Sequence, residues 1–249
     1  ITLRTVTDVS SEGIANLKTK AERRKVSMKS VLGDYVFDSK DTARDTSSAV
    51  GASVTPLLER TTGSEYEVFV SPRGTVENVK GLSEMVADLV KDNPIAQQFA
   101  GGASQAGAQQ SEQVTFVVLS EKPVSIGDQW EQPFEVEMEK FGKMKGKVVF
   151  TYEADDKVGD RPTVRIGTTT DLTLEIKLDA GGAKVSGTLT AQNAIGSFQF
   201  DPQAGRVLSA KRGSTVSGQL SVDVNGQVIP IDSSTEESHT VELLAKLPD

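Results

Sequence analysis

The sequence of 249 residues has no cysteine, a single histidine and few aromatic side chains. Without cysteine the protein cannot form disulfide bonds, use a catalytic thiol or build a cysteine zinc site, although an oxidising compartment is not excluded. No apolar run reaches the roughly 18 residues that a membrane-spanning helix requires. The formal net charge of −8 disfavours nucleic acids and anionic membrane surfaces as partners.

Motifs for catalysis and for cofactors are also missing. His239 lies in phase with Val241 and Leu243, which predicts a strand position near the rim of a core rather than the base of a catalytic triad. The glycine-rich segments lack the spacing of phosphate-binding loops. We therefore predict a protein that is not an enzyme and that binds no metal and no cofactor.

Two acidic groups of residues need separate consideration. Three glutamates are expected to share a solvated strand face with lysine partners, instead of flanking a sugar as glycosidase carboxylates do: Glu135, Glu137 and Glu139. Three aspartates leave a weak calcium site as an alternative to a solvated hairpin: Asp155, Asp156 and Asp160. We favour the hairpin, because the order of acidic residues and the central glycine of an EF-hand are missing.

Residues 112–249 predict an antiparallel β meander whose turns fix its registers. Gly181-Gly182 suits a two-residue hairpin turn, since glycine adopts positive φ without a Cβ clash. That turn pairs Leu178 with Val185, Ile176 with Gly187, Leu174 with Leu189 and Leu172 with Ala191. The apolar residues then share one face, and a slip of one residue would destroy this sorting.

Three further hairpins follow from the same reasoning. A turn at Asn225-Gly226 pairs Val222 with Ile229 and Leu220 with Ile231. Residues 201–205 predict a turn with an early proline and a late glycine. A loop of three or five residues around Gly142 sets Glu137 opposite Lys147, Glu139 opposite Lys145, Val136 opposite Val148 and Phe134 opposite Phe150. Opposite charges across strands stabilise such a register by about 0.2–1 kcal/mol each.

Residues 1–99 predict a mixture of strands and helices. The strands are expected over residues 1–9, 17–32, 35–37, 65–70 and 75–79, and the helices over 42–59 and 83–92. Asn93-Pro94 ends the second helix, whose apolar stripe includes Met85 and Leu89. The stripe is interpreted as a surface that packs on a sheet, with a ligand cavity as the alternative, because thioethers adapt to varied apolar shapes.

Two segments of unusual composition have competing interpretations. Residues 17–32 are rich in lysine and arginine, which favours an edge strand that charge protects from aggregation over a basic stripe for an anionic partner. Residues 100–111 are of low complexity and predict a flexible loop, either a solvated linker or a lid over a cavity. The whole chain, 1–249, is expected to form a single domain.

Three short motifs resemble an uncharacterised family of exported bacterial proteins that are often lipoproteins. They are residues 68–81 (VFVSPRGTVENVKG, pattern V-x-P-x-G), residues 123–130 (PVSIGDQW, pattern P-x-x-x-G-D-x-W) and residues 198–205 (FQFDPQAG, pattern F-x-F-D-x-x-x-G). The family offers no catalytic residues to carry over. The order of strands and helices is also similar, more remotely, to the half-barrel lipid carriers of the bacterial envelope, in which a curved sheet and helices enclose acyl chains.

The resemblance implies an extracytoplasmic protein at the bacterial envelope. The chain opens at Ile1 rather than Met, and we expect removal of an export signal, with simple trimming as the alternative. A lipid-attachment cysteine is absent at this position, so membrane contact is expected only through an N-terminal anchor outside the sequence.

Composition, registers and resemblance together predict a mainly β (α+β) fold. In it, a wide, curved antiparallel meander sheet, half-barrel-like, packs on one or two helices. We expect a lipid-like or other apolar ligand between sheet and helices, at Met85, Leu89, Phe150, Leu174, Leu189 and Leu220. The alternative is a structural or interaction module of the envelope that binds a protein partner and no small molecule.

Overall fold

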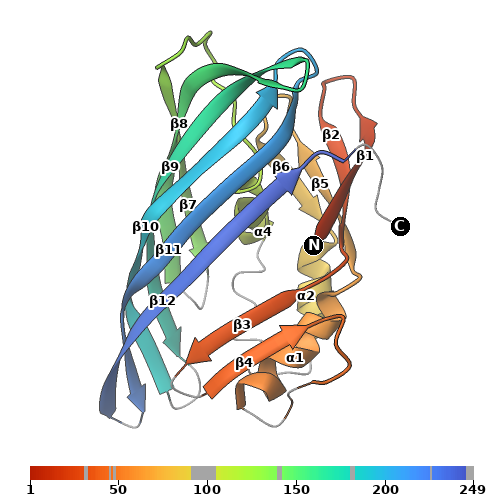
Figure 1. Ribbon diagram of the computed structural model, residues 1–249. Helices are drawn as coiled ribbons and strands as arrows, with labels where there is room; N and C mark the ends of the chain where they lie inside the picture. The colour runs from red at the N-terminus through yellow and green to blue at the C-terminus, as the bar shows by residue number, and fades with distance from the viewer. Residues whose placement is uncertain are drawn as a thin grey trace. The chain divides into compact units, whose positions relative to one another are not determined.

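The largest feature of the computed structural model is an antiparallel sheet of six strands (Figure 1). The structure describes residues 1–30, 33–44, 46, 49–90, 105–138, 142–179, 183–224 and 226–244. The chain divides into two compact units. The first comprises residues 1–71 and 76–109, and the second comprises residues 72–75 and 110–249. The fold is mainly β, as the sequence predicted.

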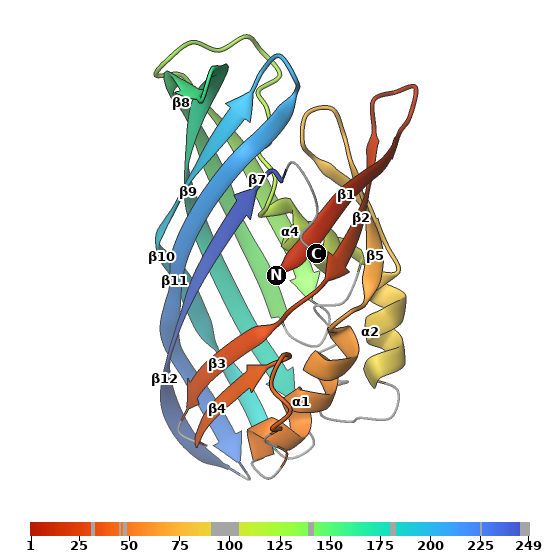
Figure 2. The ribbon, with the colours of Figure 1, turned by 45° about the vertical axis from the view of Figure 1, so that its right-hand side comes forward.

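The first unit contains a four-stranded antiparallel sheet in the order β1-β2-β5-β6, a separate β3-β4 hairpin and helices (Figure 2). Its strands are β1 (Thr2–Val9), β2 (Ala15–Ala21), β3 (Lys25–Ser30), β4 (Gly33–Asp38), β5 (Glu65–Val70) and β6 (Val76–Lys80). Helix α1 (Ala49–Thr61) lies beside β4, and α2 (Leu82–Val90) lies beside β5 and β6. Among the described residues, no helix has the length and apolar character needed to cross a bilayer.

The predicted strand over residues 17–32 is wrong in extent and in position. It is divided into β2 and β3, which belong to different sheets, and β2 lies inside its sheet instead of at the edge. The basic residues have acidic partners within the unit: Lys18 contacts Glu65 at 2.6 Å, and the Arg23 guanidinium donates to both Asp38 carboxylate oxygens. Protection of an edge therefore does not explain the charge on β2, whereas the charge on β3 does lie on an edge strand, since β3 pairs with β4 alone among the described strands.

The helix predicted over residues 42–59 begins later, at Ala49. Before it, the chain turns around Asp38, whose carboxylate accepts the backbone N–H of Lys40 at 3.0 Å. Arg44 completes the turn by donating to the carbonyl oxygens of Asp41 and Ala43. These local hydrogen bonds compete with helix formation. The helix predicted over 83–92 is present as α2, and positions 91–92 lie outside the described residues.

The low-complexity segment differs from the expected flexible loop, because residues 105–113 form a helix, α4 (Gln105–Gln113). Glutamine and alanine are good helix formers. Three glutamines spaced four residues apart lie on one side of α4. Gln105 donates to the Asn78 side chain, while Gln109 and Gln113 donate to the backbone carbonyls of Glu77 and Gly74. Positions 100–104 lie outside the described residues.

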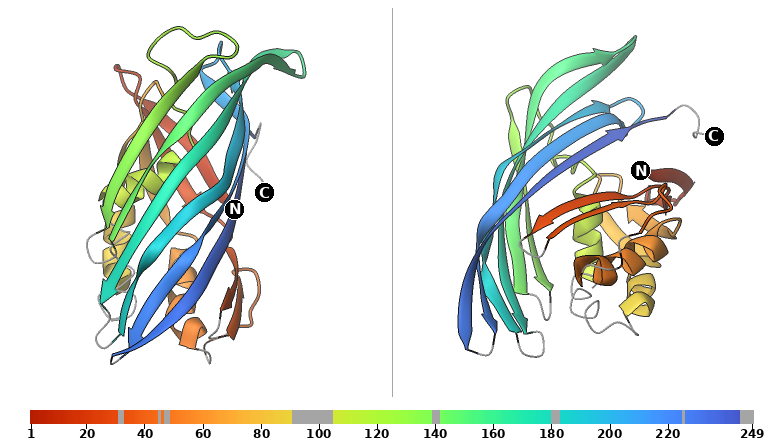
Figure 3. Two further views of the ribbon diagram at one scale, coloured as in Figure 1. Left: turned by 90° about the vertical axis from the view of Figure 1, so that its left-hand side faces the viewer. Right: turned by 60° about the horizontal axis from the view of Figure 1, so that its bottom comes forward.

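The second unit contains the six-stranded sheet, in the order β12-β11-β10-β9-β8-β7. The strands are β7 (Gln129–Met138), β8 (Gly142–Val158), β9 (Arg161–Asp179), β10 (Ala183–Asp201), β11 (Arg206–Val224) and β12 (Gln227–Glu242). Each strand pairs with its neighbour in sequence, so the sheet is the predicted meander. It is open, with β7 and β12 as its two edges, and Figure 3 shows its strong curvature.

Two of the computed registers are confirmed. Leu174 pairs with Leu189, and Leu220 pairs with Ile231. The predicted pair of Leu172 with Ala191 is not among the observed pairs, because the ladder between β9 and β10 is interrupted by a bulge between Thr190 and Ile195. Asn193 adopts a φ of 51° in this bulge. The turn of residues 180–182 lies outside the described residues, and the predicted turn after Asp201 is present.

The register predicted around Gly142 is wrong by four positions, although its parity is correct. Glu137 lies opposite Lys143, Val136 opposite Met144 and Phe134 opposite Gly146. This register lets the Phe134 ring lie over Gly146, where a Cβ atom would come within 2.9 Å of the ring. It also stacks Trp130 on Phe150, with the ring centroids 5.5 Å apart. Aromatic packing thus determined a register that charge left ambiguous.

One face of this sheet, named here the core face, carries the apolar residues. All ten residues that the sequence predicted for it share this face: Val136, Val148, Phe150, Leu172, Leu174, Ile176, Leu189, Leu220, Val222 and Ile231. Several glycines on the same face have no room for a Cβ atom, since the backbone of the next strand is too close. Glycine at such points allows a sheet to bend sharply.

A segment of the second unit covers the part of the core face that contains Phe150, Ile166 and Phe198. Residues 114–124, named here the strap, follow α4 and cross this part of the sheet. Val117 and Val118 of the strap are buried together with Phe150, Ile166 and Phe198. This cluster is the apolar core of the second unit among the described residues.

Candidate functional site

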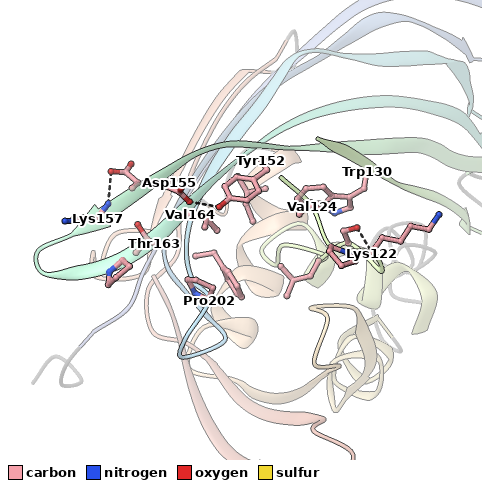
Figure 4. Close-up of a pocket in the computed structure, with 16 residues that line it drawn as sticks. Lys122, Val124, Trp130, Tyr152, Asp155, Lys157, Thr163, Val164 and Pro202 are labelled. Atoms are coloured by element: carbon pink, nitrogen blue, oxygen red, sulfur yellow. Dashed lines mark hydrogen bonds between the residues drawn. The ribbon is translucent and has the colours of Figure 1, made fainter. Parts of the chain in front are cut away.

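A cavity of about 500 Å³ lies within the second unit, where the strap meets the end of the core face (Figure 4). Its apolar lining comes from the sheet and from the strap: Leu119, Trp130, Val164, Ile166, Phe200 and Pro202. Tyr152, Asp155 and Asp156 add polar groups to the lining, as do the exposed residues Lys122 and Lys157. The volume is within the range of about 300–1,000 Å³ that is usual for small-molecule sites.

A β-bulge in β8 aims Asp155 at this cavity. Tyr152 pairs with Ile166, but the next pair joins Ala154 to Arg165, so Glu153 is an extra residue. Beyond the bulge Asp155 pairs with Val164 on the core face. Strict alternation from Tyr152 would have placed Asp155 on the opposite face. Bulges next to binding sites often redirect a side chain in this way.

Tyr152 and Asp155 form a hydrogen-bonded pair in the cavity wall. The Tyr152 hydroxyl donates to Asp155 Oδ1 at 2.6 Å, drawn as a dashed line in Figure 4. The hydrogen bond to this carboxylate, and then burial of the ring, raise the pKa of Tyr152 above its ordinary value. The phenol therefore stays protonated and fixes the orientation of Asp155.

Asp156, the next residue, also borders the cavity, but its carboxylate is engaged in a separate polar network with residues on the other face of the sheet. Gln199 Nε2 donates to Asp156 Oδ2 at 3.0 Å, and Arg165 Nη1 lies 3.3 Å from the same oxygen. The hydrogen bonds from Gln199 and from the Lys157 backbone, with the charge of Arg165, hold the pKa of Asp156 below its ordinary value. Asp155 and Asp156 thus have different surroundings. Within the parts of the chain that the structure describes, no group of three potential metal-ligating residues occurs, the acidic segment included.

The strap is held mainly through its backbone. Trp130 Nε1 donates to the Val118 carbonyl oxygen at 2.6 Å, and Arg212 Nη1 donates to the Val114 carbonyl oxygen at 3.1 Å. Leu119 exchanges hydrogen bonds with Arg73, since its N–H donates to the Arg73 carbonyl and its own carbonyl accepts the Arg73 guanidinium. Hydrogen bonds therefore hold the strap, which forms one wall of the cavity, at Val114, Val118 and Leu119.

The other end of this wall is anchored beyond the strap, at the start of β7. Asp128 Oδ2 accepts the N–H of Ser125 at 2.7 Å, and the N–H of Gly127 donates to the Tyr152 carbonyl at 2.7 Å. Tyr152 in turn donates its backbone N–H to Asp128. These bonds explain the Gly-Asp pair of the P-x-x-x-G-D-x-W segment, because Gly127 adopts a φ of 95° that favours glycine. The segment joins the strap to the Tyr152 wall.

The six residues predicted as a ligand site do not line this cavity. Met85 and Leu89 lie in α2 of the first unit. The Met85 side chain is half-buried, and the Leu89 side chain is not among those that the structure describes. Leu174, Leu189 and Leu220 gather on adjacent strands of the core face, away from the lining residues. Phe150 is nearest, because it stacks on Trp130, which does line the cavity.

His239 lies on the core face of β12, as its phase predicted, opposite Arg212. Its ring approaches the Glu237 carboxylate at 3.8 Å. The nearby His239 ring, with the charge of Arg212, lowers the pKa of Glu237. Burial lowers the pKa of Arg212. Arg212 contacts the strap at Val114, and none of these three side chains lines the cavity.

Sequence reasoning missed Tyr152, Asp155, Val164 and Phe200 as a common site. The cluster of aspartates before Arg161 predicted a solvated loop, whereas Asp155 and Asp156 lie within β8, and a bulge of one residue leaves no distinct pattern in a sequence. Trp130 was the one available signal, since it is the only tryptophan and it ends the P-x-x-x-G-D-x-W motif.

One of three comparisons with known proteins gave a match, and the match covers most of the chain. Searches of curated proteins and of solved structures gave no match. The sequence profile of a family of unknown function, DUF6263, matches residues 12–207. That range includes the strap, the bulge in β8 and every residue named above in the cavity lining, and it ends in β11. The chain therefore belongs to the DUF6263 family, a family of unknown function.

Proposed function

We propose that this protein is a non-enzymatic binding protein for a lipid-like ligand, held in the cavity between the strap and the core face. The observation that carries the proposal is the cavity itself, which has about 500 Å³ of space and a largely apolar lining. Apolar walls with a few placed polar groups are typical of small-molecule sites. By its resemblance to exported bacterial proteins, we further propose an extracytoplasmic location at the bacterial envelope.

The arrangement of the lining supports binding of a chain-like molecule. Trp130 and Phe200 present aromatic surface, and the aliphatic side chains of Val164 and Ile166 lie between them on the sheet. Burying an alkyl chain on such surface contributes roughly 0.8 kcal/mol for each methylene group. The polar groups of the wall are engaged with one another, which suits recognition of a ligand better than chemical change of it.

A homologous series of n-alkyl alcohols tests this proposal. Trp130 lines the cavity and is the only tryptophan, so its fluorescence reports binding directly. Each added methylene should tighten the dissociation constant about fourfold, from about 0.8 kcal/mol per group, until the cavity is full. Native purification followed by mass spectrometry should reveal a co-purifying lipid. Failure of every chain length to bind would refute the proposal.

A pair of substitutions separates cavity binding from adsorption elsewhere. Val164→Trp fills the cavity from the core face, whereas Val149→Trp adds the same side chain to the opposite face of the same sheet. We expect the first variant to lose binding of the longest chain and the second to retain it. Equal loss in both variants would place the ligand outside the cavity.

A second function, as an interaction module of the envelope, is favoured by the free edge of the sheet. Strand β12 has 16 residues and pairs on one side only, with β11, among the described strands. An unpaired edge is a template for strand addition by another chain. Size-exclusion chromatography with light scattering, compared with a Ser234→Pro variant, tests self-association through β12. A monomer in both samples would exclude this route to an oligomer.

A further inference from the structure

We infer that the cavity prefers an amphiphile whose head group donates hydrogen bonds, with an alkyl amine bound best, an alcohol next and a carboxylate worst. This inference rests on the proposed function and adds the class of head group. It depends on the polar groups that the protein places in the apolar wall.

The hydrogen bonding of the Tyr152–Asp155 pair leaves acceptors for the ligand. The Tyr152 hydroxyl hydrogen is directed to Asp155 Oδ1, so the phenolic oxygen can only accept from a ligand. Among the described residues, Tyr152 is the one donor to the Asp155 carboxylate, and an ionised carboxylate has several acceptor positions. An incoming donor therefore finds two acceptors side by side.

The position of Asp155 is built into the strand. The extra residue Glu153 transfers Asp155 to the core face, beside Val164 and within the cavity lining. Without the bulge, the same carboxylate would lie on the solvated face. Placing a negative charge at an apolar wall disfavours anions and favours cations and neutral donors.

The two lysines near the cavity do not cancel this preference. Figure 4 shows the Lys122 and Lys157 side chains extending away from Tyr152 on opposite sides. Asp155 and both lysines are exposed, so water and salt weaken all three charges, but only the Asp155 carboxylate is held in place by a hydrogen bond from Tyr152. The Asp155 carboxylate, fixed by Tyr152, is the charge directed at the bound head group.

The test uses three probes that have alkyl chains of the same length and differ in head group: dodecylamine, dodecanol and dodecanoate. Each is added to the whole 249-residue protein. Binding is measured by Trp130 fluorescence at low salt and neutral pH. We expect dodecylamine to bind on the order of fivefold more tightly than dodecanol, the range for a partly exposed charge pair, and dodecanoate to bind most weakly. Equal affinities for amine and carboxylate, or the reverse order, would overturn the inference.

Two substitutions that remove the same charge complete the test. Asp155→Asn should abolish the preference for the amine, while Asp160→Asn, in the β8–β9 turn and outside the lining, should preserve it. If both variants or neither lost the preference, a general field effect or another residue would be responsible, and the inference would fail. Binding of all three probes without discrimination would leave the proposed function standing, whereas no binding by any probe would refute the proposed function itself.

Discussion

Replacing Gly218 by alanine tests whether the strands approach as closely as the curvature of the core face requires. Gly218 lies in β11, opposite Leu189 of β10. A Cβ atom there would fall well inside van der Waals contact of the Thr188 carbonyl oxygen, which belongs to the backbone and cannot rotate away. Overpacking of this kind typically costs about 1–3 kcal/mol.

Gly213→Ala is the matched control in the same strand. An added Cβ atom at Gly213 meets only the Glu237 carbonyl oxygen, at an ordinary distance of 3.8 Å. Alanine restricts the unfolded chain more than glycine does, so this variant should be stabilised by about 0.4–1 kcal/mol. Two identical chemical changes are thus expected to shift stability in opposite directions.

Urea unfolding, followed by Trp130 fluorescence and by circular dichroism, measures both effects. With a slope of about 2 kcal/mol/M, Gly218→Ala should lower the unfolding midpoint by about 0.5–1.5 M, and Gly213→Ala should raise it slightly. Unchanged slopes would show that neither substitution alters the amount of surface that unfolding exposes. A Gly218→Ala midpoint equal to or above that of the wild type would refute the close approach of β10 and β11.

Three other substitutions test the contacts described above. Asp38→Asn should be less stable than the wild type above pH 4; because the hydrogen bond from Arg23 lowers the Asp38 pKa to about 2, this difference should persist down to about pH 4 and close as the pH falls to 2, as thermal melts at each pH would show. Trp130→Phe keeps a ring for stacking but leaves a strap carbonyl without its donor, so the free energy of unfolding should fall by about 1–3 kcal/mol; an unchanged value in chemical denaturation would contradict the contact. Arg212→Ala should raise amide hydrogen exchange in the strap more than in β7, and uniform exchange would argue against an anchoring role.

The meander was predictable because its registers depend on residues that are close together in the sequence, namely the turns and the strands on either side of them. Centring hairpin turns on the Gly-Gly and Asn-Gly pairs of the sequence predicted the observed pairs of Leu174 with Leu189 and of Leu220 with Ile231, and the apolar residues could share one face in only one parity. The hairpin around Gly142 shows where such reasoning stops. Two registers kept glutamates opposite lysines, and the choice between them depended on the Phe134 ring packing over a glycine of the next strand.

The cavity could not be predicted, for two physical reasons. Its position depends on a bulge at Glu153, where a single extra residue reverses the direction of each following side chain. Its wall is an irregular strap, whose path is set by long-range contacts such as Arg212 with the Val114 carbonyl, 98 residues away in sequence. Periodicity describes neither feature. Low complexity was likewise a poor guide to α4, because the Gln109 and Gln113 side chains find backbone carbonyl partners in and beside β6.

The strap is recognised through carbonyl groups that every amino acid possesses. Trp130, Arg212 and Arg73 all donate to its main chain, and Val117 and Val118 are buried in the core, so its path depends little on exposed side chains such as Lys122. Exchanges at Ser120, Lys122 or Val124 would then reshape what the site accepts without dismantling the scaffold. Under the proposed function, such an arrangement would allow related proteins to differ in ligand while they retain one common framework.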